Sequence, residues 1–538
     1  MAIQSSCWSR LNSSDSKRDS LELRRLAACA ATFVLVLAGG GSAQQRDPLK
    51  AAADALGATR IRTLQFTASG SNFTVGQNFT PNDPWPRVTV KNYTASINYE
   101  TGSMRLELWR EMGSTMPRGG GVPFSGELHQ IQVVSGNYAW NVPVPEAFPG
   151  GAGPATPCTL PEAGGTGWAG PGGSPQPIPA PESQVECMLA LWATPQGFLK
   201  AAIANNAKAT KEKGATKVSF IIGGKYRMSG IINAQNQIER VQTWIGQSIV
   251  GDMLVETEYS GYRDFGGVQF PSHILQKQDS FRSLDLTVTS VAANQTVDIV
   301  VPDNVRNAPP TPSVAVNSQK LADGVFFLTG GTHHSLAIEM KEYMVLVDTP
   351  NGEARALAVI AKAKEFIPGK PIRYVVAMHH HWDHLGGIRT AIDEGATIIT
   401  HQTNRTFLER AAQAPHMINP DRLSISKKPL KLQTVDAEGT LTDGTRTIKL
   451  YTMAGFEHSA DMLMVYLPKE RILAEADAYS PPETPTIPLI APKVPYAAAL
   501  YDNIHRLKLT VETIAPFHGA GTTGMAEVAR QGGATLSH

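Results

Sequence analysis

Polar and apolar residues alternate along short runs through the first 300 residues of the chain. Examples are residues 87–90 (Arg-Val-Thr-Val), 104–108 (Met-Arg-Leu-Glu-Leu) and 284–288 (Leu-Asp-Leu-Thr-Val). A period of two places successive side chains on opposite faces of a strand, so these runs predict half-buried strands of an antiparallel sheet. Residues 149–181 are crowded with glycine and proline and predict a long loop, and a helix is predicted near 195–207. A mainly antiparallel β domain is therefore predicted over residues 47–305.

The pattern changes after a proline-rich stretch at residues 307–312 (Asn-Ala-Pro-Pro-Thr-Pro). Such a stretch is stiff and extended, which predicts a linker at 306–314 between independent domains. Beyond it, strand-like runs at 343–347 and 372–378 alternate with helix-like runs at 354–366 and 403–412. Strands that alternate with helices predict an α/β domain, here over residues 315–533.

Composition narrows the class of partner. Hydrophobic residues make up 42% and charged residues 18% of the 538 positions, which is typical of a soluble globular protein with more than one core. The 48 basic and 47 acidic side chains leave a formal charge of +1. With so small a net charge, the protein has no overall electrostatic field that would attract nucleic acid or an anionic membrane. We therefore expect a small-molecule substrate and no nucleic-acid partner.

The N-terminal segment has the features of a signal peptide. Lys17, Arg18, Arg24 and Arg25 precede an apolar run at residues 26–38, and small residues follow at 41–43. The apolar run is shorter than the roughly 20 residues that span a bilayer. We therefore expect residues 1–43 to be cleaved, which leaves no stable membrane span and predicts a periplasmic or secreted protein.

Removal of that segment would leave two cysteines, Cys158 and Cys187. In an oxidising compartment such a pair suggests one disulfide, and two unpaired buried thiols are the alternative.

The strongest chemical signal is the run His-His-His-Trp-Asp-His at residues 379–384. The apolar residues 374–378 end abruptly at this run, which places it where a buried strand emerges from its sheet. His379 and His381 can point the same way, whereas Asp383 and His384 begin the next turn. Imidazoles for one ion, and a carboxylate with an imidazole for a second, predict two adjacent metal half-sites, with Zn²⁺ as the expected metal.

This run resembles the first motif of the metallo-β-lactamase superfamily, and its exact residue sequence is similar to that of the glyoxalase II branch. Three later strand-end residues, His458, Asp477 and His518, match the remaining ligands of that superfamily in order. The resemblance implies an αββα sandwich in the C-terminal domain, preceded by the β domain. It also implies a first metal held by His379, His381 and His458, a second held by Asp383, His384 and His518, and Asp477 as a bridge.

Two divalent ions that share a water lower its pKa and polarise a carbonyl group, so a metal-bridging hydroxide is the expected nucleophile. Asp383 is expected to orient that nucleophile and is the predicted catalytic residue. Four further residues are expected to support the site or contact substrate: Asp348, His333, His334 and Tyr479.

A lactone or an ester is the favoured substrate. Asp477 replaces the cysteine that one β-lactamase subgroup uses, and no cysteine follows Cys187. A glyoxalase-type thioesterase and a β-lactamase stay open as alternatives, and phosphodiester hydrolysis is disfavoured by the near-zero charge. In another class of function, residues 261–271 and 297–302 weakly resemble the sheet of lipoprotein-localisation carriers, which implies binding of a lipid or apolar ligand by the N-terminal domain.

Overall fold

The computed structural model describes residues 47–113, 117–121, 127–144, 176–309, 314–481 and 495–533. The expected signal peptide, Cys158 and the prolines at 310 and 312 lie outside these ranges. The suggested disulfide and the extended linker therefore stay predictions, although Cys187 itself is buried on a helix. Residues 46–538 form one compact unit.

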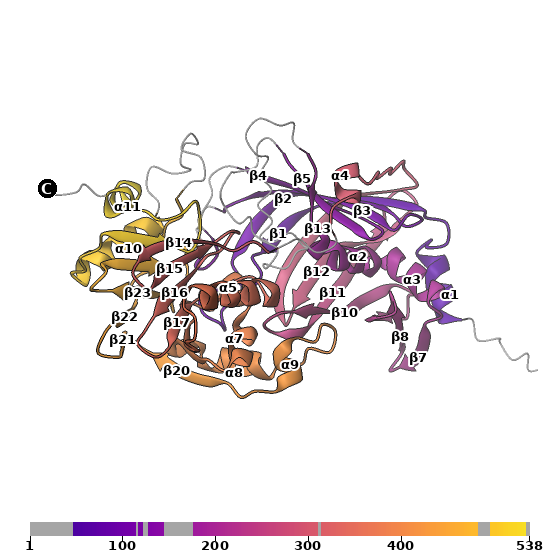
Figure 1. The fold of residues 1–538 in the computed structure, drawn as a ribbon. Coiled ribbons are helices and arrows are strands. Elements are labelled where there is room, and N and C mark those ends of the chain that lie inside the picture. The colour runs from indigo at the N-terminus through magenta and orange to yellow at the C-terminus, as the bar shows by residue number, and fades with distance from the viewer. Residues whose placement is uncertain are drawn as a thin grey trace, which may run out of the picture. The chain divides into compact units, whose positions relative to one another are not determined.

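The N-terminal part is built on a single 13-stranded sheet (Figure 1). Every pair of neighbours is antiparallel, and neighbours in the sheet are consecutive in sequence except for β1 and β13. The consecutive strands β6 and β7 form its two edges. The three alternating runs lie in β2, β3 and β13, so those strand predictions are confirmed. The strands are β1 (Thr63–Phe73), β2 (Arg87–Asn98), β3 (Ser103–Glu111), β4 (Glu127–Ser135), β5 (Tyr138–Val142), β6 (Ile178–Pro179), β7 (Lys208–Glu212), β8 (Ala215–Ile222), β9 (Tyr226–Ile232), β10 (Ile238–Gln247), β11 (Gly251–Asp264), β12 (Gln269–Gln278) and β13 (Phe281–Ala293).

Two of the helices in this part, α2 and α3, pack against the sheet, and α3 confirms the helix predicted near residues 195–207. The helical elements are α1 (Pro48–Ala55), η1 (Pro181–Ser183), α2 (Gln184–Ala193), α3 (Pro195–Ala204) and α4 (Asp303–Arg306).

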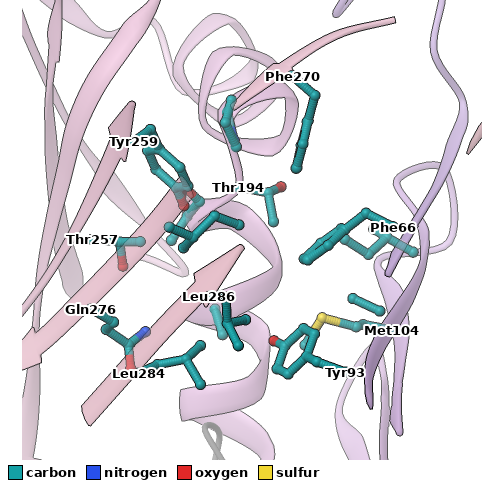
Figure 2. Close-up of a pocket in the computed structure, with 16 residues that line it drawn as sticks. Phe66, Tyr93, Met104, Thr194, Thr257, Tyr259, Phe270, Gln276, Leu284 and Leu286 are labelled. Carbon is teal, nitrogen blue, oxygen red and sulfur yellow. Dashed lines mark hydrogen bonds between the residues drawn. The ribbon is translucent and has the colours of Figure 1, made fainter. Parts of the chain in front are cut away.

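A small cavity lies between this sheet and helices α2 and α3 (Figure 2). Its walls are mainly apolar, with Phe66, Met104, Phe270 and Leu286 among them. The space amounts to about 50 Å³. Pockets for drug-sized ligands hold roughly 300 Å³ or more, so this cavity as described is too small for a lipid chain.

The C-terminal part contains two further sheets. The first is antiparallel from β14 to β17 and parallel from β17 to β20, and the second is antiparallel from β21 to β24 with β25 parallel to β24. The strands are β14 (Asn317–Ala322), β15 (Val325–Thr329), β16 (Ser335–Glu339), β17 (Met344–Val347), β18 (Ile372–Val376), β19 (Thr397–His401), β20 (Lys431–Val435), β21 (Glu438–Thr442), β22 (Thr447–Thr452), β23 (Leu463–Leu467), β24 (Ile472–Glu475) and β25 (Thr513–Pro516).

Apolar side chains on both faces of the first sheet explain the layers. Val345 and Val347 of β17 join the core shared with the second sheet, whereas Met344 and Leu346 face the opposite core. Helix α5 covers that opposite face with residues at helical spacing, among them Ala356 and Val359. The helical elements are α5 (Glu353–Phe366), α6 (Trp382–Leu385), α7 (Ile388–Glu394), η2 (Gln402–Asn404), α8 (Arg405–Gln413), α9 (Arg422–Ser426), α10 (Pro495–Arg506) and α11 (Met525–Gly532).

The predicted α/β layering is therefore confirmed, with helices outside two facing sheets. Among the residues that the structure describes, no helix combines the length and the apolar character that a membrane span requires.

Candidate metal centre

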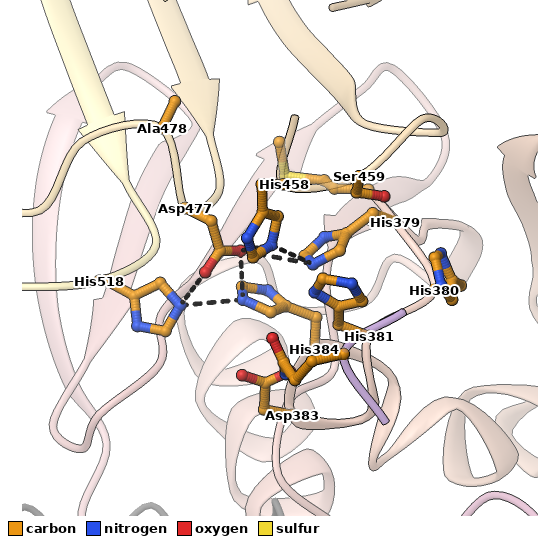
Figure 3. A network of polar contacts seen from close by, with 12 residues as sticks. His379, His380, His381, Asp383, His384, His458, Ser459, Asp477, Ala478 and His518 are labelled. Carbon is orange, nitrogen blue, oxygen red and sulfur yellow. Dashed lines mark hydrogen bonds and ion pairs between the residues drawn. The ribbon is translucent and has the colours of Figure 1, made fainter. Parts of the chain in front are cut away.

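The predicted ligands come together because each lies just beyond a strand or in a connection between strands. His379 follows β18, Asp477 follows β24 and His518 follows β25, while His458 lies between β22 and β23. Side chains at the ends of neighbouring strands share one edge of the fold, where a rigid scaffold positions the loops. Figure 3 shows these imidazoles and carboxylates converging on one point.

Asp477 lies at the centre of the cluster. Its Oδ2 atom lies 3.0 Å from Nε2 of His384 and 3.4 Å from Nε2 of both His379 and His458. Its Oδ1 atom lies 3.0 Å from Nε2 of His518. One carboxylate thus contacts imidazoles of both predicted half-sites, which is the geometry of a bridging ligand.

The first half-site consists of His379, His381 and His458, and all three are fully buried. Nε2 of His379 lies 3.4 Å from Nε2 of His458, and the ring centroids of His381 and His458 are 4.3 Å apart. Three imidazoles at these separations form a donor set that suits Zn²⁺.

The second half-site contains Asp383, His384 and His518, with Nε2 of His384 3.0 Å from Nε2 of His518. A fourth residue, His333, joins them: its Nε2 atom lies 3.2 Å from Oδ2 of Asp383. Mixed imidazole and carboxylate donors again fit a zinc-like divalent ion.

Burial and neighbouring charges shift the pKa values of the predicted ligands in ways that affect cation binding. Burial holds the pKa of His379 and of His381 well below the usual value, so both rings are neutral and can ligate. Although burial opposes its charge, the carboxylates of Asp477 and Asp348 raise the pKa of His384. Burial likewise opposes the charge on Asp477, but the surrounding imidazoles hold its pKa well below the usual value. A metal ion must therefore displace a proton from His384.

Comparison with known proteins agrees with this geometry. The family profile of the metallo-beta-lactamase superfamily matches residues 328–518, which include all seven predicted ligands. The C-terminal domain belongs to the metallo-β-lactamase superfamily. It is accordingly a metal-dependent hydrolase domain, and the fold class expected from the sequence is confirmed.

Solved structures with similarity to the chain include a metallo-beta-lactamase from Pontibacter korlensis and one from Hirschia baltica. The first is 20% identical, with 40% of this chain and 96% of that chain covered at a TM-score of 0.31. The second is 23% identical, with 40% of this chain and 96% of that chain covered at a TM-score of 0.30. No curated protein matched the chain.

Three further predicted residues, Asp348, His334 and Tyr479, lie outside the set of predicted metal ligands. Asp348 accepts hydrogen bonds through Oδ2 from Nδ1 of His384 and through Oδ1 from the backbone N–H of Met378, both at 2.8 Å. Nε2 of His334 donates to the backbone oxygen of Gly519, next to His518. The hydroxyl of Tyr479 donates to Glu527 on α11, so it is engaged outside the ligand cluster.

Backbone conformation marks two of these residues. Asp348 has φ of 53° and Asp477 has φ of 62°, in the left-handed region that residues other than glycine seldom occupy. Asp348 directly follows β17 and Asp477 lies two residues beyond the end of β24, and strained backbone of this kind is concentrated at functional sites. Gly386 and Gly387 serve the expected close approach: a Cβ on Gly386 would lie 2.3 Å from the backbone carbon of Asn351.

His380 points away from the cluster formed by His379, His384, His458 and Asp477, as Figure 3 shows. Its Nδ1 atom lies 2.8 Å from Oδ1 of the buried Asp461. The middle histidine of the run therefore belongs to a buried polar network that also includes Ser459 and Asn404.

Sequence reasoning missed four contributors to the site. The amide of Gln77 donates to Oδ1 of Asp383 at 2.8 Å, and the backbone oxygens of Asn78 and Gly120 accept from His381 and His458. The fourth is Tyr496 on α10, whose ring centroid lies 5.6 Å from that of His458. No metal-binding or catalytic motif includes these positions.

Proposed function

We propose that the protein is a binuclear zinc hydrolase that attacks the carbonyl group of a small lactone or ester. The bridging position of Asp477 between the two half-sites carries this proposal. Two divalent ions bound there would acidify a shared water and polarise the carbonyl group. Asp383 would orient the attacking oxygen, because its carboxylate is fixed on both sides by Gln77 and His333.

The burial of the ligands supports a small substrate. His379, His381, His384 and His458 have no exposed surface, whereas the side chain of His518 is 14% exposed. Among the described ligands, the second half-site is thus the more open one. A substrate that reaches the centre from this side must present a slender reacting group.

Tyr496 is suited to bind the carbonyl oxygen. Its buried hydroxyl has no hydrogen-bond partner among the residues that the structure describes. Burial raises its pKa, so the hydroxyl keeps its proton at neutral pH and can donate it in a hydrogen bond.

Asp477 disfavours one alternative, because it stands where a cysteine would indicate one β-lactamase subgroup, and a lactone or an ester is the substrate that we favour among the remaining carbonyl compounds. The signal-like residues 1–43 support export to the periplasm or beyond, and N-terminal sequencing of the mature protein tests that part of the proposal.

A substrate panel tests the reaction. Lactones, nitrophenyl esters, glutathione thioesters, nitrocefin and a phosphodiester are incubated with the full protein, with and without a chelator. We expect close to two zinc ions per chain and chelator-sensitive turnover of lactones or esters.

The matched variants are His458→Ala, which removes a ligand, and His505→Ala, which removes an exposed histidine on α10. The first should abolish turnover and the second should leave it unchanged. Full activity in His458→Ala would contradict the mechanism, and turnover of the phosphodiester alone would reassign the reaction class.

A further inference from the structure

Two segments of the N-terminal part lie directly against the metal ligands. The first, residues 74–80, follows β1, and the second, residues 117–121, lies between β3 and β4. Nε2 of His381 donates to the backbone oxygen of Asn78 at 2.8 Å, and Nδ1 of His458 donates to the backbone oxygen of Gly120. We call residues 74–80 and 117–121 the supporting loops.

These contacts determine which ring nitrogen faces the metal. A neutral imidazole carries one N–H, and the acceptor of that N–H leaves the other nitrogen free to ligate. Asn78 thus leaves Nδ1 of His381 as the ligand atom, and this atom has no other partner among the described residues. Gly120 leaves Nε2 of His458, which is the atom that faces Asp477.

The supporting loops are fixed to each other and to the hydrolase domain by backbone hydrogen bonds. The N–H of Gly120 donates to the oxygen of Gln77, and the N–H of Gly119 donates to the oxygen of Glu457, both at 2.8 Å. Gly119 has φ of +84°, and a Cβ there would lie 2.5 Å from the oxygen of Gln77. Only glycine fits this position without displacing a loop.

Trp382, within the histidine run, packs on the same segment. A Cβ on Gly76 would lie 2.5 Å from the indole of Trp382, whose ring also meets that of Trp85 edge-on with centroids 5.8 Å apart. The metal motif is therefore attached to the N-terminal part by packing as well as by hydrogen bonds.

We propose that the N-terminal sheet domain is a structural component of the metal centre, and that the supporting loops act as positioning elements without which the metal centre loses affinity for zinc. The inference rests on the proposed binuclear site but does not depend on which substrate is cleaved. Gln77 is the one side chain of these loops that contacts a predicted ligand, and it extends the same support to Asp383.

A glycine pair in the full-length protein tests the proposal. Gly119→Ala places a methyl group against the oxygen of Gln77, whereas Gly121→Ala, two positions away, meets nothing within 4 Å. Zinc affinity is measured without substrate by competition with a chromophoric chelator. Partners of metal ligands contribute roughly 10–100-fold to affinity, so we expect a loss of that size in Gly119→Ala and none in Gly121→Ala.

Gln77→Met provides a milder variant, because it removes the amide and keeps the length of the side chain. We expect weaker zinc binding and an altered visible spectrum of the Co²⁺-loaded protein, with no more than the small drop in the unfolding midpoint of the metal-free form that the loss of one hydrogen bond to the buried Asp383 causes. A purely structural role would instead shift the unfolding midpoint and leave the Co²⁺ spectrum unchanged.

The outcomes separate this inference from the proposed function. Zinc affinity equal to wild type in both Gly119→Ala and Gln77→Met would overturn the inference alone. If Gly119→Ala does not fold, the affinity and spectrum of Gln77→Met decide. A wild-type protein that binds no zinc would overturn the inference and the proposed function together.

Discussion

Replacement of Asp348 by asparagine should lower the affinity of the second half-site for zinc without removing any of the predicted ligands. The carboxylate is 1% exposed and accepts two hydrogen bonds of 2.8 Å, from Nδ1 of His384 and from the backbone N–H of Met378. An ionised carboxylate is an acceptor at both oxygens, so it matches two donors. An asparagine side chain offers only one acceptor.

The perturbation acts through the tautomer of His384. If the amide oxygen of Asp348→Asn keeps the N–H of Met378, its NH₂ group faces Nδ1 of His384, and that nitrogen must accept. The ring proton then moves to Nε2, the atom that lies 3.0 Å from Asp477 and should bind the metal. A protonated Nε2 cannot ligate, so we expect a loss of roughly 10–100-fold in affinity, or about 1.4–2.8 kcal/mol. The opposite amide orientation leaves the N–H of Met378 facing a donor and also disfavours the native site.

Zinc titration and urea unfolding of the metal-free protein distinguish this mechanism from simple loss of structure. Asp348→Ala leaves two buried donors without an acceptor at about 1–3 kcal/mol each, so it should destabilise the protein by roughly 2–6 kcal/mol. Asp348→Asn should lose affinity with a smaller loss of stability. The exposed Asp502→Asn on α10 is the control for charge. Wild-type affinity for the second ion in Asp348→Asn would refute the tautomer argument.

Three further predictions concern the second half-site, the pocket and the scaffold. His333→Leu removes the hydrogen bond to Asp383 and should lower kcat by roughly 10-fold or more while the protein stays folded. Steady-state kinetics measures kcat and circular dichroism checks the fold. An unchanged kcat would contradict this prediction. Tyr496→Phe should reduce kcat about 10²-fold with little change in zinc content, because the hydroxyl is expected to donate to the developing oxyanion. A change in zinc content without a change in kcat would instead assign Tyr496 to metal binding. Although burial opposes its charge, hydrogen bonds from Arg389 lower the pKa of Asp421 to about 2. Asp421 is only partly buried, so solvent screening reduces the resulting stabilisation to about 1 kcal/mol. It is complete above the unfolded pKa near 3.9 and is lost as the pH falls through 2, so urea unfolding should show Asp421→Asn to be destabilised at pH 7 and nearly neutral at pH 2. An equal effect at both pH values would refute this prediction.

The residues that the structure brings together in the candidate metal centre could be predicted because each of them carries a local signal. His379, Asp477 and His518 each follow an apolar strand, and their order along the chain matches a known superfamily motif. The strand periodicity also identified β2, β3 and β13 correctly, since alternate residues face a single core. These signals lie within a few residues of the positions that they identify.

The supporting contacts could not be predicted for the same reason. Gln77 lies 306 positions from Asp383, and Asn78 and Gly120 contribute backbone oxygens that any residue type possesses. The three glycines at 119–121 indicate that the backbone there has an unusual conformation, but not what it contacts. The role of Tyr496 could not be predicted either, because a tyrosine on an amphipathic helix is most often part of a hydrophobic core.

Control of the ligand tautomers is divided between the two parts of the chain. In the first half-site, the outer nitrogens of His381 and His458 donate to backbone oxygens of the N-terminal supporting loops. In the second, Nδ1 of His384 donates to Asp348, and Nδ1 of His518 donates to the backbone oxygen of Thr332, both within the hydrolase domain. Because an outer hydrogen bond sets the basicity and direction of a ligand, the imidazoles of the two half-sites depend on different parts of the fold, although Gln77 of the supporting loops also donates to Asp383 of the second half-site. Movement of the supporting loops should therefore weaken zinc binding most at the first half-site, where two imidazoles would lose their acceptors, whereas the second half-site would lose only the contact of Gln77 with Asp383.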